Sequence, residues 1–240
     1  MNIIRAGSLL FALIVFAAGR LNAAILTGSV APPPASVNLT IEGSTDWIHW
    51  GLNTATDVDR KITGGSMISN FSTIGSGTNV VRLTDSPSKA SWIDGTPDLT
   101  VTNTPSGVYI NNFDGPGRGF VFTVPAGLLT QVLKVYVGEF TASGTLQAVL
   151  SDNSAPAYSQ VLTGAANQTV QGVYTINFAA ASPGQTLTVK WTETSDLGNA
   201  DNITMQSAAL SIPGGIPEPT TLTLLATSIM MLTRRRCRLG

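Results

Sequence analysis

The stretch GFVFTV, residues 119–124, alternates large apolar side chains with smaller or polar ones. Successive side chains of a β-strand point to opposite faces, so Phe120, Phe122 and Val124 would share one face and turn it toward a core. Pro-Ala-Gly follows directly at residues 125–127, and these residue types favour a tight turn. The pattern of a short alternating segment followed by turn residues predicts antiparallel strands.

The same two-residue period recurs along the chain. Turn residues bound the segments, and the 24 glycines and 13 prolines of the chain disfavour long helices. Many short strands without intervening helical periods predict an all-β protein, an antiparallel β-sandwich or jelly roll over residues 37–213. The further alternating segments are 37–41, 133–137, 145–150, 173–178 and 187–191.

The N-terminus has the pattern of a signal peptide. Arg5 precedes an apolar run from Leu9 to Ala18, which is too short to span a bilayer comfortably. The small residues Ala23 and Ala24 follow. We therefore expect a signal helix at residues 1–23, cleavage after Ala23, and a proline-rich spacer at residues 24–36. Export of the mature chain follows from this prediction.

The C-terminus, residues 214–240, has three ordered parts. The triplet Pro217, Glu218 and Pro219 precedes an apolar run at residues 220–233. As a helix the run would span only about 21 Å, less than the ~30 Å of a bilayer core, which predicts a short transmembrane helix and a weak anchor. Basic side chains favour the cytoplasmic side of a membrane. The basic end, residues 234–238, contains Arg234, Arg235, Arg236 and Arg238.

This arrangement closely resembles a PEP-CTERM sorting tail. The resemblance implies a Gram-negative bacterium that makes extracellular polysaccharide and biofilm, and an exosortase-type processing enzyme as partner. It also implies that Pro217, Glu218 and Pro219 are the recognition motif. We then expect a precursor held in the inner membrane and a mature protein at the cell surface or in the extracellular matrix. The alternative is an ordinary C-terminal anchor with chance prolines.

Charge and cysteine content exclude several functions of the body. Residues 24–213 contain 13 acidic and seven basic residues, and thus a net charge of −6 (7 minus 13). Phosphates reward clustered Lys and Arg, so nucleic acid is not an expected partner. The only cysteine, Cys237, lies in the tail, which excludes disulfides, thiol catalysis and cysteine zinc sites in the body.

The most distinctive segment of the body is DWIHWG, residues 46–51, which is echoed by SWIDG at residues 91–95. On a strand, Trp47 and His49 would share one face, opposite Trp50. Aromatic rings stack on sugars, and neighbouring polar groups bond their hydroxyls, so one face would form a glycan platform. The alternative is that the tryptophans fill a core, which we favour for Trp50 and Trp191. The candidate ligand-binding set is Asp46, Trp47, His49, Trp92 and Asp94.

Other chemistry has weaker support. Asp57, Asp59, Asp196 and Asp201 offer oxygen ligands that suit calcium, but without the spacing of a known calcium loop, so no cofactor is expected. No nucleophile elbow or zinc motif is present, and no pair of carboxylates is singled out for glycoside hydrolysis. We therefore expect a non-enzymatic protein.

The body also resembles galactose-binding-like jelly rolls, modules found in assorted secreted bacterial proteins. This resemblance supports the fold and carries over no ligand residues. The expected function is an exported surface or matrix protein that binds extracellular polysaccharide. The alternatives are a structural coat component and a glycan-active enzyme. The segments that carry the resemblance are DWIHWG, DVDRK, SWIDGTPD, GVYI, LKVYVGEF, LSDNSAPAY and GQTLTVKWTE.

Overall fold

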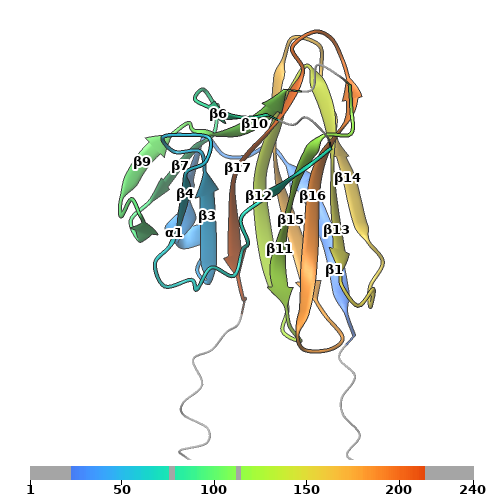
Figure 1. Ribbon diagram of the computed structural model, residues 1–240. Coiled ribbons are helices and arrows are strands. Elements are labelled where there is room, and N and C mark those ends of the chain that lie inside the picture. The colour runs from blue at the N-terminus through green and yellow to red at the C-terminus, as the bar shows by residue number, and fades with distance from the viewer. Residues whose placement is uncertain (1–22, 76–78, 112–114, 214–240) are drawn as a thin grey trace, which may run out of the picture.

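The computed structural model describes residues 23–75, 79–111 and 115–213. It confirms the all-β prediction, because these residues form strands in three sheets and a single helical turn. The two larger sheets lie face to face, as Figure 1 shows, with the apolar core between them. The alternating stretch around residue 120 supplies part of this core, since Phe120, Phe122 and Val124 are buried there.

The larger sheet contains nine strands and is mostly built from long antiparallel neighbours. Its main path runs in the order β1-β15-β12-β17-β3-β4-β8, and β10 and β6 form a branch from β17. The strands are β1 (Ile25–Ala31), β3 (Asp46–Trp50), β4 (Val58–Lys61), β6 (Val80–Leu83), β8 (Gly95–Thr96), β10 (Gly107–Asn111), β12 (Gln131–Phe140), β15 (Thr169–Ala179) and β17 (Asn202–Ser211).

The opposing sheet has five strands in the order β14-β13-β16-β11-β5. Their inward side chains meet those of the larger sheet, and Trp191 and Trp50 both lie in this core, as predicted for these two tryptophans. The strands are β5 (Ser72–Ile74), β11 (Gly119–Ala126), β13 (Ala142–Leu150), β14 (Tyr158–Leu162) and β16 (Gln185–Asp196).

Strand β17 forks the larger sheet. One of its edges pairs along its whole length with β12, whereas the other pairs with β10 over residues 202–205 and with β3 over residues 207–210. Gln206 lies at the junction, where the register between β17 and β12 shifts by one residue. The outer face of the larger sheet is thereby divided into an upper half beside β10 and a lower half beside β3.

A small third sheet covers the lower half of that outer face. It consists of β2 (Ser36–Asn38), β7 (Lys89–Trp92) and β9 (Val101–Thr104), with the short helix α1 (Leu39–Glu42) beside it. A second apolar cluster fills the space beneath it. Among the described residues, no third sheet or helix lies over the upper half in Figure 1.

Two segments differ from the sequence-based expectation. Residues 25–31, expected as part of a spacer, form β1, because Leu26 turns into the core and the whole segment pairs with β15. The alternation expected to continue through residues 37–41 stops at Asn38, whose side chain accepts a hydrogen bond from the Ile41 N–H and caps α1. The other five alternating segments lie within strands of the structure.

Both ends of the described chain leave the sandwich at the lower end, as Figure 1 shows. Ile25 pairs with Ala179 and Ser211 pairs with Val132, so the first and last strands begin and end at the same level. The predicted signal helix, the sorting motif and the basic end lie outside the described residues. Within those residues, no helix is long and apolar enough to cross a membrane.

Candidate functional site

The predicted aromatic site is a packed cluster and not an open platform. Trp47, His49 and Trp92 are fully buried, and their rings pack on one another. The ring centroids of Trp47 and Trp92 are 5.2 Å apart, and those of His49 and Trp92 are 5.0 Å apart. The structure thus brings these three residues together, but the small sheet covers the face on which we expected a sugar.

Several polar atoms of this cluster are bonded within the protein, whereas Nδ1 of His49 has no hydrogen-bond partner among the described residues. The Trp47 indole N–H donates to Oδ1 of Asp94 at 3.0 Å, and the Thr40 hydroxyl donates to the same oxygen at 2.5 Å. Lys61 pairs with the other carboxylate oxygen of Asp94. These interactions lower the pKa of Asp94 against the opposing effect of burial, which is the largest single influence. Asp94 thus fastens α1 and the small sheet to the larger one.

Asp46 and His49, which flank Trp47 in the sequence of β3, are both buried. Burial, assisted by the nearby Arg82, lowers the pKa of His49 to about 4, so the ring is neutral at pH 7 and Nε2 faces the Ser106 carbonyl at 3.2 Å. Burial also raises the pKa of Asp46, whose Oδ2 accepts the Ile68 N–H at 2.9 Å. With Asp46, Trp47 and His49 inside the protein, this cluster offers a ligand no open aromatic face.

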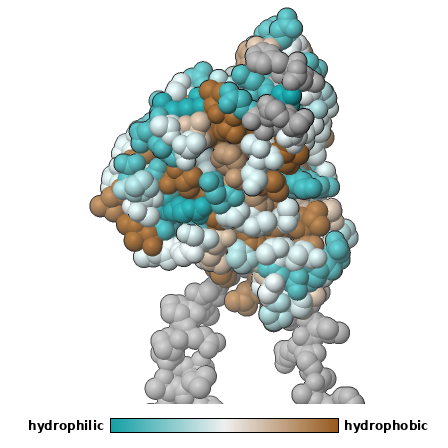
Figure 2. All heavy atoms as spheres, viewed as in Figure 1, coloured by the Kyte–Doolittle hydropathy of each residue, from teal (hydrophilic) through white to brown (hydrophobic). Residues whose placement is uncertain are grey.

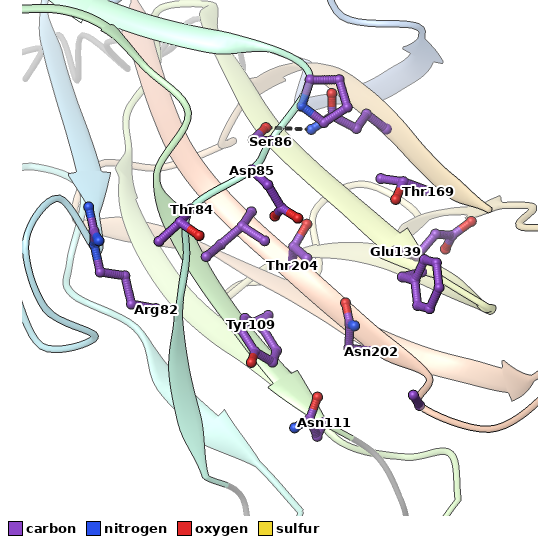
Figure 3. Close-up of a pocket in the computed structure, with 15 residues that line it drawn as sticks. Arg82, Thr84, Asp85, Ser86, Tyr109, Asn111, Glu139, Thr169, Asn202 and Thr204 are labelled. Atoms are coloured by element: carbon purple, nitrogen blue, oxygen red, sulfur yellow. Dashed lines mark hydrogen bonds between the residues drawn. The ribbon is translucent and has the colours of Figure 1, made fainter. Parts of the chain in front are cut away.

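The upper half of the outer face forms a groove of about 500 Å³. Its floor follows from strand alternation: Val108 and Ile110 turn into the core, so Tyr109 and Asn111 point outward from β10. By the same rule Asn202 and Thr204 point outward from β17. Tyr109 pairs with Thr204 and Asn111 pairs with Asn202, so these four side chains form a polar and aromatic block, shown in Figure 3.

The floor continues across β12 and β15. Thr204 lies opposite Gly138, which in turn lies opposite Gln171. A Cβ at Gly138 would lie 2.8 Å from the Thr204 hydroxyl and 3.1 Å from the Val170 carbonyl, so glycine keeps the centre of the floor low. The half-buried ring of Phe140 continues the floor toward the upper end.

One wall of the groove is the segment from Thr84 to Ser88. Two glutamines from the sheet fasten it: Gln171 donates to the Ser86 hydroxyl at 2.6 Å and accepts the Ser88 N–H at 2.9 Å, and Gln206 donates to the Ser88 carbonyl at 3.0 Å. This fixed wall presents the exposed carboxylate of Asp85, which points toward Thr204 in Figure 3.

The groove holds few charges. Arg82 lies at its edge, but its guanidinium donates to the carbonyls of Gly51, at 3.2 Å, and of Leu52, at 2.9 Å. Among the groove residues, Asp85 is the exposed charged side chain, and the half-buried Arg82 keeps its positive charge at the edge; the other accessible polar groups are hydroxyls and amides. Such a surface suits a neutral ligand with many hydroxyls.

Glu139 borders the upper end of the groove, although strand alternation turns its side chain toward the sandwich interior. It is fully buried, and within the described residues neither carboxylate oxygen has a hydrogen-bond partner of normal geometry. Burial raises the pKa of Glu139 to about 8, with the Gly144 backbone opposing the rise. This carboxyl group is therefore largely protonated at neutral pH.

The four calcium candidates lie in two separate places. Asp57 accepts the N–H groups of Asn53 and Thr54, both at 2.9 Å, and Asp59 accepts the Asp98 N–H at 3.0 Å. These acceptor roles are those of turn residues. Asp196 and Asp201 lie instead beside Glu193, whose pKa is raised by burial and by Asp201.

In the described part of the chain, no group of three or more acidic, His or Cys residues is arranged to hold a metal ion. The four aspartates therefore remain without structural support as calcium ligands.

The sequence does not single out the groove residues. Tyr109 and Phe140 lie in segments 107–110 and 133–140, which carry a resemblance that assigns no ligand residues, and nothing in the spacing of Asp85, Tyr109, Phe140 and Asn202 links them. They come from four different segments and meet only through strand pairing. The available sequence signal for an exposed binding face was the polar residues at the outward positions of β10 and β17, whose inward positions are apolar.

Comparisons with known proteins found structural likeness only. No protein-family model matches the sequence, and no curated protein matches it significantly. Among solved structures, the carbohydrate-binding module TmCBM61 in complex with β-1,4-galactotriose has a TM-score of 0.40 and 12% identity, over 60% of this chain and 89% of that chain.

Two larger proteins match in part. The enzymatically active domain of tailspike protein 4 from bacteriophage CBA120 has a TM-score of 0.38 and 10% identity, over 61% of this chain and 19% of that chain. The CBM22-1–GH10 modules of endo-1,4-β-D-xylanase 10B from Clostridium thermocellum, complexed with xylohexaose, have a TM-score of 0.36 and 11% identity, over 61% of this chain and 27% of that chain.

Proposed function

We propose that this chain is an exported protein whose β-sandwich binds a neutral polysaccharide in the groove beside β10 and β17, without catalysis. The observation that carries the proposal is the groove itself. Outward hydroxyls, amides and two aromatic rings line it, and the side chains of Gln171 and Gln206 hold its wall. The site thus differs from the aromatic cluster that the sequence suggested.

Sugar chemistry fits this surface for two reasons. The apolar face of a pyranose stacks on aromatic rings, which Tyr109 and Phe140 supply. Sugar hydroxyls both donate and accept hydrogen bonds, and the amides of Asn111 and Asn202 do the same. Because Asp85 would repel a polyanion, uronic-acid polymers are the less suitable ligands.

Polysaccharide retention of the full chain would test this site. In affinity electrophoresis with neutral glucans, xylans and galactans, at least one polymer should retard the wild type. Tyr109→Ala should weaken retention by about tenfold, since a lost aromatic stack of about 1.4 kcal/mol changes an affinity tenfold. Val161→Ala, at an exposed position outside the groove, is the control and should behave as wild type. No retention on any polymer would remove the binding function.

The alternative of a structural coat component has its own supporting observation. Four aliphatic side chains are more than half exposed beside the small sheet: Ile41, Ile62, Ile93 and Leu99. They gather around Asp94, because Ile93 N–H bonds Thr40 and Ile62 N–H bonds the Asp94 carbonyl. Brown residues at this edge are visible in Figure 2.

Such a patch favours self-association. Sedimentation velocity of the wild type and of Ile93→Ser would detect this self-association. Assembly of the wild type that Ile93→Ser abolishes would favour the coat function.

An enzyme is disfavoured by the position of Glu139. A general acid must come within hydrogen-bond reach of the glycosidic oxygen, and Glu139 is fully buried on the core side of β12. Release of reducing ends that disappears in Glu139→Gln would reverse this assignment.

The sorting tail is the second half of the proposal. We expect the mature protein to begin near Ala24 and to lose its C-terminus near Pro217, Glu218 and Pro219 in a cell that has the exosortase-type enzyme. Mass spectrometry of the mature chain measures both ends. A mature chain that keeps Arg234 to Arg238 would leave the tail as an anchor alone.

A further inference from the structure

The lower end of the sandwich exposes aliphatic side chains. Leu128 and Leu129, in the turn between β11 and β12, are 40% and 68% exposed, and Ile25 at the start of β1 is 37% exposed. Ile25 pairs with Ala179, and the next residue, Ala180, bonds the Gly127 carbonyl at 2.8 Å. The start of β1 and the turn that carries Leu128 and Leu129 are thus joined through the end of β15 and lie at the same end of the sandwich.

This end carries little charge. The turn at residues 125–130 has no charged residue, nor has the neighbouring loop at residues 180–184, and the loop at residues 151–157 contains Asp152 alone. No ion pair therefore needs to be broken when these loops enter a less polar environment. Water-exposed leucines flanked by uncharged residues suit the interface of a bilayer.

The chain that follows β17 leaves from this same end. Only six residues, 214–219, separate the described body from the apolar run at residues 220–233. Six extended residues reach at most about 20 Å, so a tail held in a membrane would keep the lower end at the membrane surface. We propose that Ile25, Leu128 and Leu129 rest on the lipid bilayer while the tail is uncut. This inference depends on the proposed tail, but not on glycan binding.

A lipid surface fits this patch better than a second copy of the chain. A stable protein interface buries about 800 Å² on each partner, and three separated side chains cover only part of that area. Shallow insertion into a bilayer needs no matching surface. It also turns the groove outward, because nine residue steps of β17 separate Asn202 in the groove from Ser211, a distance of about 30 Å.

The test uses the full chain in vesicles of phosphatidylcholine and phosphatidylglycerol in about equal amounts. Cys237→Ser first removes the native thiol, and an environment-sensitive dye is then attached to Leu129→Cys or, as control, to Val161→Cys, which is 50% exposed on β14. We expect a blue-shifted emission and protection from aqueous iodide at position 129 alone. Equal quenching at the two positions would overturn the proposal.

Two further outcomes bear on the inference. Shielding at position 129 that increases with the protein-to-lipid ratio would assign the patch to a second copy of the chain. A full chain that fails to float with the vesicles would show that the tail does not hold it to the membrane. Either result overturns the proposal. Polysaccharide retention on the same vesicles reports on the groove separately. The double variant Leu128→Ser, Leu129→Ser should lose the shielding of a dye at Ile25→Cys and keep glycan retention.

Discussion

Replacing Glu139 by glutamine should stabilise the protein at alkaline pH and leave it unchanged at acid pH. The carboxyl group is buried without normal hydrogen-bond partners among the described residues, and burial raises its pKa to about 8 from the ordinary value of 4.5. The folded state therefore keeps a proton that the unfolded state releases. By linkage, the stability that this proton supplies is complete below pH 4.5 and is lost progressively as the pH rises to about 8.

The size of the effect follows from the same shift. One pKa unit corresponds to about 1.4 kcal/mol, so a rise from 4.5 to about 8 corresponds to at most about 5 kcal/mol above pH 8. Relaxation and water entry reduce the penalty of a buried charge, so we expect Glu139→Gln to gain between about 2 and 5 kcal/mol at pH 9. A neutral amide has no charged form, and its gain at pH 4 should be near zero.

Urea unfolding of the wild type and Glu139→Gln between pH 4 and pH 9 measures this difference. Asp57→Asn is the control of opposite sign, because hydrogen bonding from Thr54 lowers the pKa of Asp57 and neutralising it should cost stability at neutral pH. If the free energies of unfolding of wild type and Glu139→Gln run parallel over the whole range, Glu139 is not held protonated and the reasoning fails.

Three other substitutions test particular parts of the fold. Trp47→Ala should destabilise the protein by about 3–5 kcal/mol in urea unfolding, as expected of a fully buried tryptophan, and the folded fraction should keep its glycan affinity. Gln206→Met removes the hydrogen bond to the Ser88 carbonyl, worth about 1 kcal/mol, and should weaken polysaccharide retention about fivefold with a small change in Tm. Gly51→Ala should lower the Tm measured by circular dichroism, because Gly51 has a φ of 78° and an added Cβ would lie 2.1 Å from the Gly107 carbonyl oxygen.

The sequence predicted the strands of the sandwich well where alternation was unbroken. The segments around Phe120 and Trp191 became β11 and β16 because their apolar residues fall at every second position. Alternation also placed Trp47 and Trp50 on opposite faces of β3. Local pattern was sufficient for these predictions, since each depends on residues close in the chain.

The location of the site could not be predicted in the same way. Alternation separates the two faces of β3 but does not say what covers either face, and the cover over Trp47 comes from residues 36–104. In the groove, Tyr109 and Thr204 are neighbours only because β10 occupies the upper part of one β17 edge. That arrangement depends on the fork of the sheet, which has no local signature.

The sandwich also begins earlier in the chain than residue 37, where the sequence predicts its start. The prolines at residues 32–34 suggested a spacer, whereas the preceding segment forms a full edge strand through Leu26 and its pairing with β15. Proline ends a strand without excluding one before it.

The forked strand β17 is the last strand of the body to be made, and it joins β12, β10 and β3. A chain emerges from the ribosome, or from a translocation channel, with its N-terminus first. Until residue 211 has emerged, the two halves of the larger sheet lack the strand that connects them, and strands made earlier expose unpaired edges. The apolar run that begins at residue 220 follows only a few residues after the end of β17. Closure of the sandwich therefore depends on β17, and a chain truncated before Asn202 lacks Asn202 and Thr204 of the groove floor.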